Sequence, residues 1–415
     1  MNKIVIVFFS LLSFTLHAQV TDETVSLGTG YANQVWYSLS DGEESSAAMN
    51  NWDLSFDVSA FGVAIFTNSV TGTMLWNYEN GDIADWAIVD TTGLSTWQER
   101  FNSDTSWAGG AFNNYVDPEN EYDVDWGIYN PTTHVISGDS IYIIKLSNGE
   151  FKKLIIESVI DGAFNFKYAN IDGSSEENVT LIKSNYTGKN FAYYSIQNNA
   201  EVDREPLAAN WDLLFGQYTT LLTDDVPYTV TGVLSNINVT VAQAAPVDQT
   251  TYTDYAAQTF FTAINTIGYD WKSFSGTAFV LSDTTVYFVK TANADIWKIV
   301  FTGFEGSATG NIEFNKELLT TTGIEIAENN NASIALYPNP AEAENITLIY
   351  TLEKQVSINI LSIYDASGRL IITENLNTNA GLHQHTISNQ NLAAGIYFVN
   401  LMVDGKSIQQ KLIVK

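Results

Sequence analysis

Apolar residues alternate with polar ones, or gather in short β-branched and aromatic runs, along most of the chain. The alternation is clearest near the C-terminus, in VSINILSIYD (356–365) and GIYFVNLMV (395–403). Earlier in the chain, IYIIKL (141–146) consists mainly of residues with high β-propensity. The dipeptide Asn148-Gly149 that follows is typical of a hairpin turn. The pattern therefore predicts an all-β protein of antiparallel strands.

Helical periodicity is scarce. No long segment repeats its apolar residues every 3.6 positions. The best helix candidate is YTDYAAQTFFTAINT (252–266). We therefore expect helices to contribute little to the fold.

Two blocks of sequence occur twice in the same order. NWDLSF (51–56) recurs as NWDLLF (210–215), each after an aromatic-Tyr-Ser-aliphatic stretch. Residues 125–157 recur as residues 270–302, with a constant offset of 145 positions. Such a pattern predicts a tandem duplication. The predicted β domains are repeat 1, residues 22–183, and repeat 2, residues 184–319.

The repeated NWD phrase favours a structural role. Trp52 and Trp211 are expected to anchor a core, while Asp53 and Asp212 bind backbone amides at a turn. The alternative is a Trp platform with a polar partner for a sugar or another flat ligand. Both interpretations concern the same four residues.

The N-terminus has the pattern of an export signal. A positive Lys3, a short apolar run and a small Ala18 predict a secretory signal peptide over residues 1–19. No later segment is long and apolar enough to span a membrane as a helix. The chain has no Cys, which excludes disulfides, thiolate metal sites and Cys nucleophiles.

The negative charge is concentrated before the C-terminal region. Residues 20–330 contain 12 Lys and Arg against 41 Asp and Glu, whereas residues 331–415 contain 5 against 6. Such a surface repels nucleic acid and anionic lipid, so neither is an expected partner. It favours solubility or the binding of cations.

The last 80 residues differ in kind, with balanced charge and regular strands that fit a small β-sandwich. They closely resemble the type A C-terminal sorting domain of the type IX secretion system, over residues 334–415 after a polar linker, 320–333. This resemblance implies translocation by that machinery and removal of the tail by a sorting peptidase. It also implies a product that is secreted or held on the outer-membrane surface, after transit through the periplasm. The motif residues are Tyr337, Pro338, Asn339, Pro340, Gly368, Arg369, Gly395 and Lys415.

The repeats themselves resemble the HmuY-like haem-binding family of Bacteroidota. The resemblance rests on the aromatic-Tyr-Ser entry, the Trp-Asp-aliphatic-X-Phe strand and the hairpin IYIIKLSNGEFKKLIIESV. It implies an all-β surface protein that holds haem through paired His or paired Met. The chain departs from that family in lacking the lipoprotein Cys.

Haem iron requires an axial donor such as imidazole or thioether. After removal of signal and tail, the donors of these two types are His134, Met49 and Met74, all in repeat 1. Repeat 2 has neither His nor Met. A haem site is therefore expected in repeat 1, or through Tyr.

Carboxylates alternate in DPENEYDVDWG, and on an extended strand they would share one face. A hard cation such as calcium would relieve their repulsion. A solvated acidic loop is the alternative, since the EF-hand pattern is not met. The candidate calcium ligands are Asp117, Glu119, Glu121, Asp123 and Asp125.

The sequence predicts no enzyme. Gly138-Asp139-Ser140 resembles a hydrolase block only faintly, and no partner His motif follows it. We expect a surface binding protein, and two kinds remain open: a haem-capturing protein, or a structural, adhesive or glycan-binding one. For glycans, the candidate aromatic residues lie in a segment of repeat 1 without a counterpart in repeat 2: Trp76, Trp86, Trp97 and Trp107.

Overall fold

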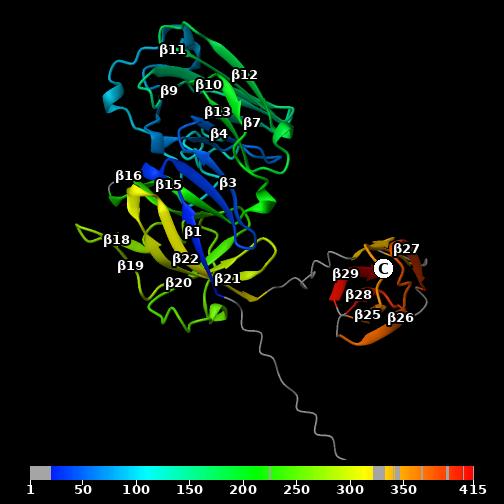
Figure 1. Cartoon of the computed structure of the whole chain (residues 1–415). Coiled ribbons are helices and arrows are strands. Elements are labelled where there is room, and N and C mark those ends of the chain that lie inside the picture. The colour runs from blue at the N-terminus through cyan, green and yellow to red at the C-terminus, as the bar shows by residue number, and fades with distance from the viewer. Residues whose placement is uncertain are drawn as a thin grey trace, which may run out of the picture. The chain divides into compact units, whose positions relative to one another are not determined.

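The computed structural model describes residues 20–320 except 224–225, and residues 332–414 except 340, 342–345, 366–367, 389–391 and 405. The predicted signal peptide and residues 321–331 of the predicted linker lie outside the described residues. The chain divides into two compact units, residues 1–320 and residues 321–415. We call them the body and the tail (Figure 1).

The body contains two β-sandwich lobes, as an all-β chain predicts. Lobe I spans residues 54–202. Its smaller sheet has the order β14 (Ala200–Val202), β13 (Phe191–Ser195), β4 (Leu54–Asp57), β5 (Ile65–Thr67). Its larger sheet has the order β12 (Glu177–Ile182), β11 (Ala163–Asn170), β10 (Phe151–Ile160), β8 (Val135–Gly138), β7 (Gly127–Asn130), and β9 (Tyr142–Lys145) joins β10 to β6 (Met74–Asn77).

Lobe II is built from residues 21–48 and 213–320. Its four-stranded sheet has the order β16 (Pro227–Ser235), β15 (Leu213–Leu221), β2 (Asn33–Ser38), β3 (Gly42–Ala48). Its five-stranded sheet has the order β1 (Thr21–Ser26), β22 (Asn311–Thr320), β21 (Ile296–Phe304), β20 (Val286–Lys290), β17 (Thr240–Ala244). A separate hairpin pairs β18 (Lys272–Phe274) with β19 (Phe279–Leu281).

Each lobe combines strands from both predicted repeats. In lobe I, β13 of repeat 2 pairs with β4 of repeat 1, and Tyr194 lies opposite Leu54. In lobe II, β2 of repeat 1 pairs with β15 of repeat 2, and Tyr37 lies opposite Leu213. The lobes therefore do not coincide with residues 22–183 and 184–319. The first three strands of repeat 1 (β1 to β3) and the first two strands of repeat 2 (β13 and β14) complete the lobe formed by the other repeat.

The alternating patterns of the strands place one face of each sheet in a core. In lobe I, Phe56 of the smaller sheet and Phe166 of the larger one stack at a centroid distance of 5.1 Å, and both are fully buried. In lobe II, Phe215 and Phe314 stack in the same way at 5.5 Å. Burial of such rings supplies the main stabilising free energy of a sandwich without disulfides.

Helical structure in the described residues is limited to short 3₁₀ turns. They are η1 (Thr29–Tyr31), η2 (Ser69–Thr71), η3 (Ile83–Ile88), η4 (Leu94–Thr96), η5 (Lys183–Tyr186), η6 (Ala208–Asn210), η8 (Tyr255–Ala257) and η9 (Gly306–Ala308). The predicted helix over 252–266 is wrong, because Phe261 exchanges two backbone hydrogen bonds with Val241 of the edge strand β17. None of the helices described is long and apolar enough to cross a membrane.

The tail is the predicted small β-sandwich. One sheet has the order β23 (Ala332–Tyr337), β24 (Ile346–Leu352), β27 (Gly381–Ile387). The other has the order β26 (Leu370–Asn375), β25 (Asn359–Asp365), β28 (Gly395–Val403), β29 (Lys406–Val414). Apolar residues of both sheets form its core.

The sorting motif has a structural role in the tail. The Asn339 side chain donates to the carbonyl of Lys411 at 2.7 Å and accepts from the N–H of Ile413 at 3.0 Å, so it attaches the first motif to the last strand. Gly368 has φ +82°, and the Arg369 guanidinium closes that turn on Asp365 at 2.9 Å. Gly395 begins β28, Tyr337 ends β23 and Pro338 directly follows it. Pro340 and Lys415 lie outside the described residues.

Candidate functional site

The two NWD motifs occupy equivalent places in the two lobes. The N–H of Asp53 donates to the carbonyl of Tyr194 at 2.9 Å, and the N–H of Asp212 donates to that of Tyr37 at 2.9 Å. Each Asp therefore caps a strand contributed by the other repeat. The two copies of the NWD motif therefore make the same contact in the two lobes.

An Asn side chain supports each Trp of the motif. Asn68 Nδ2 donates to the carbonyl of Trp52 at 3.0 Å, and Asn236 Nδ2 donates to that of Trp211 at 2.7 Å. Both indoles lie outside the sandwich cores, on the outer faces of the two four-stranded sheets, where the lobes meet. Trp211 is buried and Trp52 half-buried there.

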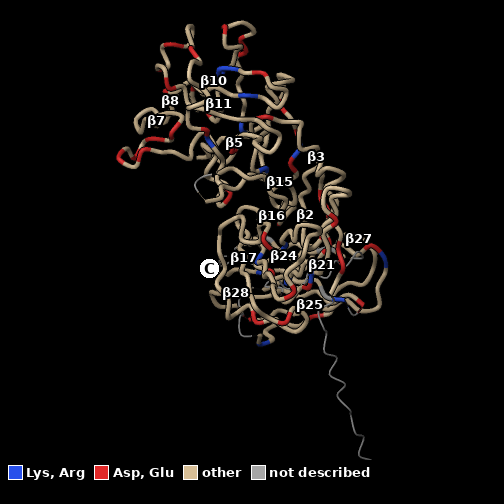
Figure 2. The backbone as a smooth tube through the Cα atoms, turned by 90° about the vertical axis from the view of Figure 1, so that its left-hand side faces the viewer, with Lys and Arg blue, Asp and Glu red and all other residues tan. Residues whose placement is uncertain are grey.

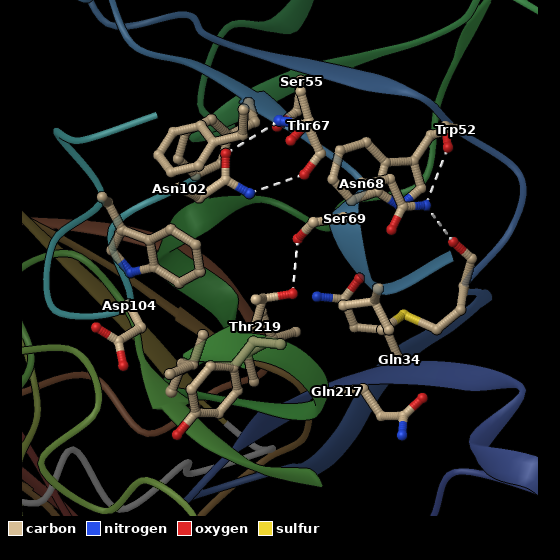
Figure 3. A pocket seen from close by; sticks show the side chains of 18 of the residues that line it. Gln34, Trp52, Ser55, Thr67, Asn68, Ser69, Asn102, Asp104, Gln217 and Thr219 are labelled. Carbon is tan, nitrogen blue, oxygen red and sulfur yellow. Dashed lines mark hydrogen bonds between the residues drawn. The ribbon is translucent and has the colours of Figure 1, made fainter. Parts of the chain in front are cut away.

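The junction between the lobes contains a cleft with aromatic and polar walls (Figure 3). Trp107 of lobe I packs against apolar clusters from both lobes, and its Nε1 donates to the carbonyl of Ser235 in lobe II at 2.8 Å. The aromatic residues of its lining are Trp36, Trp52, Phe66, Trp107, Phe191, Tyr193, Trp211 and Tyr218. The polar ones include Gln34, Asn68, Asn102, Asp104, Glu205 and Gln217.

Hydrogen bonds join the two lobes around the cleft. The hydroxyls of Ser69 in lobe I and Thr219 in lobe II are 2.8 Å apart, a bond drawn in Figure 3. Asp104 of lobe I accepts from Thr220 at 2.6 Å and from Asn265 at 3.2 Å, both in lobe II. These bonds hold the walls in a fixed geometry, and such pre-organisation lowers the cost of binding a ligand.

Three buried polar atoms of the cleft residues have no hydrogen-bond partner among the described residues: Nε1 of Trp52, Nε1 of Trp211 and the hydroxyl of Tyr218. Leaving a buried donor unsatisfied costs about 1–3 kcal/mol. The cavity measures about 100 Å³, room for roughly three waters at ~30 Å³ each. The amides of Gln34 and Gln217, which also line the cleft, add hydrogen-bonding groups to its wall.

A buried ionisable cluster lies beside the cleft. The Arg204 guanidinium lies over Trp36, Trp52 and Tyr193, at 5.1–5.5 Å from the ring centroids, and burial lowers its pKa to about 10. Glu205 accepts from the Tyr193 hydroxyl at 3.2 Å and from two backbone N–H groups. Burial raises the pKa of Glu205 to about 8, so its carboxyl is mainly protonated at neutral pH.

The structure places the three predicted haem donors in three different surroundings. Met49 is buried and lines the cleft, whereas Met74 on β6 packs against the cluster around Trp76. His134 is exposed in the turn after β7, with φ +58° and its Nδ1 2.7 Å from the Tyr129 hydroxyl. Of the three, Met49 alone lines the cleft.

The predicted calcium loop is not extended, so its carboxylates do not share one face. The segment forms successive turns in which Asp117 and Asp123 accept backbone N–H groups. Asp125 instead pairs with Arg100, and Glu119 and Glu121 are exposed. Within the described parts of the chain, no three or more His, Asp or Glu side chains are placed to hold a metal ion.

The four Trp residues proposed for glycans are divided between two places. Trp76 and Trp97 are buried in a satellite core of lobe I, with Trp86 packed against it. Trp86 Nε1 donates to Glu176 at 2.8 Å, and Lys153 lies over its ring at 4.7 Å. Only Trp107 of the four lines the cleft.

Sequence reasoning missed Tyr218, Arg204 and Glu205. Tyr218 follows the repeated NWDLLF phrase on the same strand, and alternation along that strand places it on the same outer face as Leu214. Arg204-Glu205 was detectable as a charged pair just before that motif. Nothing local indicated that the pair would be buried.

The described residues form a two-lobed β body, with a cleft between its lobes, and a small β-sandwich tail. Residues 335–415 match the model of the secretion system C-terminal sorting domain, as the motifs predict. The chain thus carries a type IX secretion sorting tail and is exported to the cell surface or the outer membrane. In the loops of lobe I, Asp and Glu recur and Lys and Arg are few (Figure 2).

None of the curated proteins compared with this chain matches it. Among solved structures, dimeric latent PorU from Porphyromonas gingivalis aligns with 95% of this chain and 34% of its own, at 12% identity and a TM-score of 0.19. The chain thus spans about a third of that PorU chain. The N-terminal domain of the Streptococcus gordonii adhesin Sgo0707 aligns with 67% of this chain and 87% of its own, at 9% identity and a TM-score of 0.13. Neither likeness bears on fold or function.

Proposed function

We propose that this protein is a non-enzymatic binding protein of the cell surface and that the cleft between its lobes holds an uncharged, hydroxyl-rich ligand, a sugar of a glycan. The observation that carries the proposal is one aromatic and amide-lined cleft, three of whose lining residues, Trp52, Trp211 and Tyr218, each hold a buried polar atom without a hydrogen-bond partner among the described residues. Hydroxyl oxygens satisfy indole N–H donors, and aromatic faces pack against the C–H faces of a sugar.

Charge and size both favour a neutral ligand entering by one edge. Asp104 lines the cleft in a body that is strongly acidic, so an anionic ligand meets repulsion. The cavity of about 100 Å³ takes an edge of a sugar ring, whereas pockets that enclose a whole small molecule or cofactor usually measure about 300–1,000 Å³.

Haem capture through the HmuY-like resemblance is the second candidate, and Met49 in the cleft lining favours it. A porphyrin would require the lobes to separate and would bring two propionates beside Asp104. Haemin titration tests this directly. A Soret shift that is lost in Met49→Ala and kept in Met74→Ala would support haem in place of a sugar.

The test of the main proposal is glycan screening of the full chain, followed by calorimetry with the best saccharide. The variants Trp52→Phe, Trp211→Phe and Tyr218→Phe each remove one hydrogen-bonding group and keep a ring in place. We expect each variant to raise the Kd for the saccharide about tenfold, which corresponds to a loss of roughly 1.4 kcal/mol of binding free energy. Trp76→Phe, outside the cleft, is the matched control. Absence of saccharide binding, or an equal loss in the control, would contradict the proposal.

A further inference from the structure

Lobe II contains a second, polar pocket of about 310 Å³ that lies apart from the cleft. It is formed by the turn between β2 and β3, the start of the NWDLLF strand and the hairpin between β20 and β21. Its lining includes Ser40, Asp41, Glu44, Asp212, Thr291, Asp295 and Trp297. The described residues that line it include no Lys or Arg.

The equivalent place in lobe I is filled by the chain itself. Gln197 Nε2 donates to the Asp53 carboxylate at 2.9 Å and to the Ser147 hydroxyl at 2.9 Å. Asp53 also accepts from the Ser195 hydroxyl at 3.2 Å, and only 1% of the residue is exposed. An N–H donor thus occupies the position in front of the repeated Asp.

Lobe II lacks the groups that close this position. The carbonyls of Tyr37 and Tyr194 accept the N–H groups of Asp212 and Asp53 in the same way. Three residues after each Tyr, Ser40 in lobe II therefore corresponds to Gln197 in lobe I. The constant offset of 145 makes Ala292 the counterpart of Ser147. Ala292 has no polar side-chain group, and the Ser40 hydroxyl donates to the Asp41 carboxylate at 2.7 Å. The Asp212 carboxylate accepts the N–H of Leu39 at 2.8 Å and otherwise borders the open pocket.

A buried hydroxyl of the pocket is also without a partner. Thr291 corresponds to the core residue Leu146 of lobe I, and it is 8% exposed. Its Oγ1 is buried and has no hydrogen-bond partner within the part of the chain that the structure describes. Lobe II therefore has a hydroxyl in this wall at the position where lobe I has an apolar side chain.

The lining of the pocket is acidic. Burial raises the pKa of Asp212 and the nearby charges of Asp295 and Asp41 raise it further, whereas the Leu39 N–H and the charge of Lys316 outside the lining lower it. Such repulsion is relieved when a positive charge enters. Trp297, half-buried in the lining, offers an aromatic surface of the kind that attracts organic cations.

We propose that this pocket binds a primary ammonium group, in which the ligand's N–H donors take the place that the Gln197 amide has in lobe I. Asp212 and Asp295 accept from the ammonium, Thr291 Oγ1 accepts a further N–H, and Trp297 lies along the alkyl chain. A metal ion is the less suitable cation, because no three carboxylates in the described residues are placed to ligate one. The site is independent of the glycan proposal.

The experiment is calorimetric titration of the full chain at low ionic strength with 1,5-diaminopentane, and separately with a blocked Gly-Lys-Gly peptide. We expect the protonated amine to bind with a Kd of about 1 mM or tighter. Preference for the peptide would assign a protein lysine as the source of the ammonium, and preference for the diamine would assign a free amine. The uncharged 1,5-pentanediol is the ligand control, and equal binding of it would overturn the proposal.

Two variants locate the binding. Ser40→Gln supplies the amide that closes lobe I, and Asp212→Asn removes the charge while keeping an oxygen for Leu39. Each is expected to weaken amine binding at least tenfold with an unchanged melting temperature. Ser46→Gln, an exposed change on β3 outside the pocket, should leave binding intact. Unchanged binding in both test variants, or displacement of the amine by stoichiometric calcium, would overturn the proposal.

Discussion

Glu205 shows how burial sets the chemistry of a single residue. It is 2% exposed, and three donors surround its carboxyl: the Tyr193 hydroxyl and the N–H groups of Asn190 and Phe191. These hydrogen bonds lower its pKa, but the desolvation of the carboxylate is the larger effect and raises it to about 8. The folded protein therefore keeps a proton that the unfolded chain releases near pH 4.5.

This difference predicts a pH-dependent stability. The raised folded pKa means that the contribution of Glu205 is fully present below pH 4.5 and is lost as the pH rises toward 8. The free energy of unfolding should fall with pH in that window, by up to about 1.4 kcal/mol per pH unit. Glu205→Gln should flatten this slope in urea denaturation curves measured from pH 5 to pH 8.

The exposed Glu119→Gln is the control and should keep the wild-type slope. An identical slope in wild type and Glu205→Gln would show that the carboxyl is ionised in the folded protein at pH 5.

At the scale of elements, the tail depends on contacts between its first motif and its last strand. Asn339 follows β23, and its side chain makes two hydrogen bonds to the backbone of β29. Ala341 adds a backbone bond to Ile413 at 2.7 Å. These bonds join the first and last segments of the tail, so the sorting motif also stabilises the fold of the tail.

Asn339→Ala should therefore weaken the tail. Loss of two hydrogen bonds is expected to cost about 1–2 kcal/mol of the free energy of unfolding. We expect a lower melting temperature of the tail and a smaller fraction of protein at the cell surface, measured by surface proteolysis and immunoblotting. Gln384→Ala, exposed on β27, is the matched control. Equal surface fractions in both variants would contradict a structural role for Asn339 in export.

At the scale of the molecule, the exchange of strands makes lobe I continuous in sequence and lobe II discontinuous. Lobe I needs β13 and the residue after it, because Ala192, Tyr194 and Ile196 belong to its core. Lobe II needs β1 to β3 from the N-terminus, where Val25 and Tyr37 join its core. The pairing of β1 with β22 ties the first strand of the body to the last.

Two fragments test this arrangement. Residues 51–204 contain every strand of lobe I and should unfold cooperatively in urea. Residues 22–183 lack β13 and β14, leave an edge of β4 unpaired, and should show no cooperative transition. Cooperative unfolding of 22–183 with none in 51–204 would indicate that each repeat folds by itself.

Export of the whole chain depends on the sorting domain in its tail. Deleting residues 336–415 removes the sorting domain and should retain the body in the periplasm. Cell fractionation with antibodies to the body measures this. Arrival of the shortened protein at the surface would show a second export route.

The sequence by itself determined the strand content, the duplication signal and the tail. These are local properties: alternation in GIYFVNLMV, β-branched runs such as IYIIKL, and short motifs such as Tyr337-Pro338-Asn339 can each be detected without knowing which strand pairs with which. The equal spacing between the second blocks of the repeats indicated equivalent positions before any contact was known. The helix expected at 252–266 failed because a long-range pairing with β17 competed with local propensity.

Only the tertiary structure decided how the repeats combine and where the sites lie. The partner of a strand is not encoded locally, since β2 could pair with its own repeat or with β15 and buries similar residues either way. That choice brings Trp52 and Trp211 to one junction and buries Glu205 beside them. It also places Ser40 next to Asp212 in lobe II, at the position where Gln197 contacts Asp53 in lobe I. The pocket of lobe II therefore stays open, whereas Gln197 fills the equivalent place in lobe I. Burial and proximity between residues more than a hundred positions apart arise from packing, and packing is a property of the whole fold.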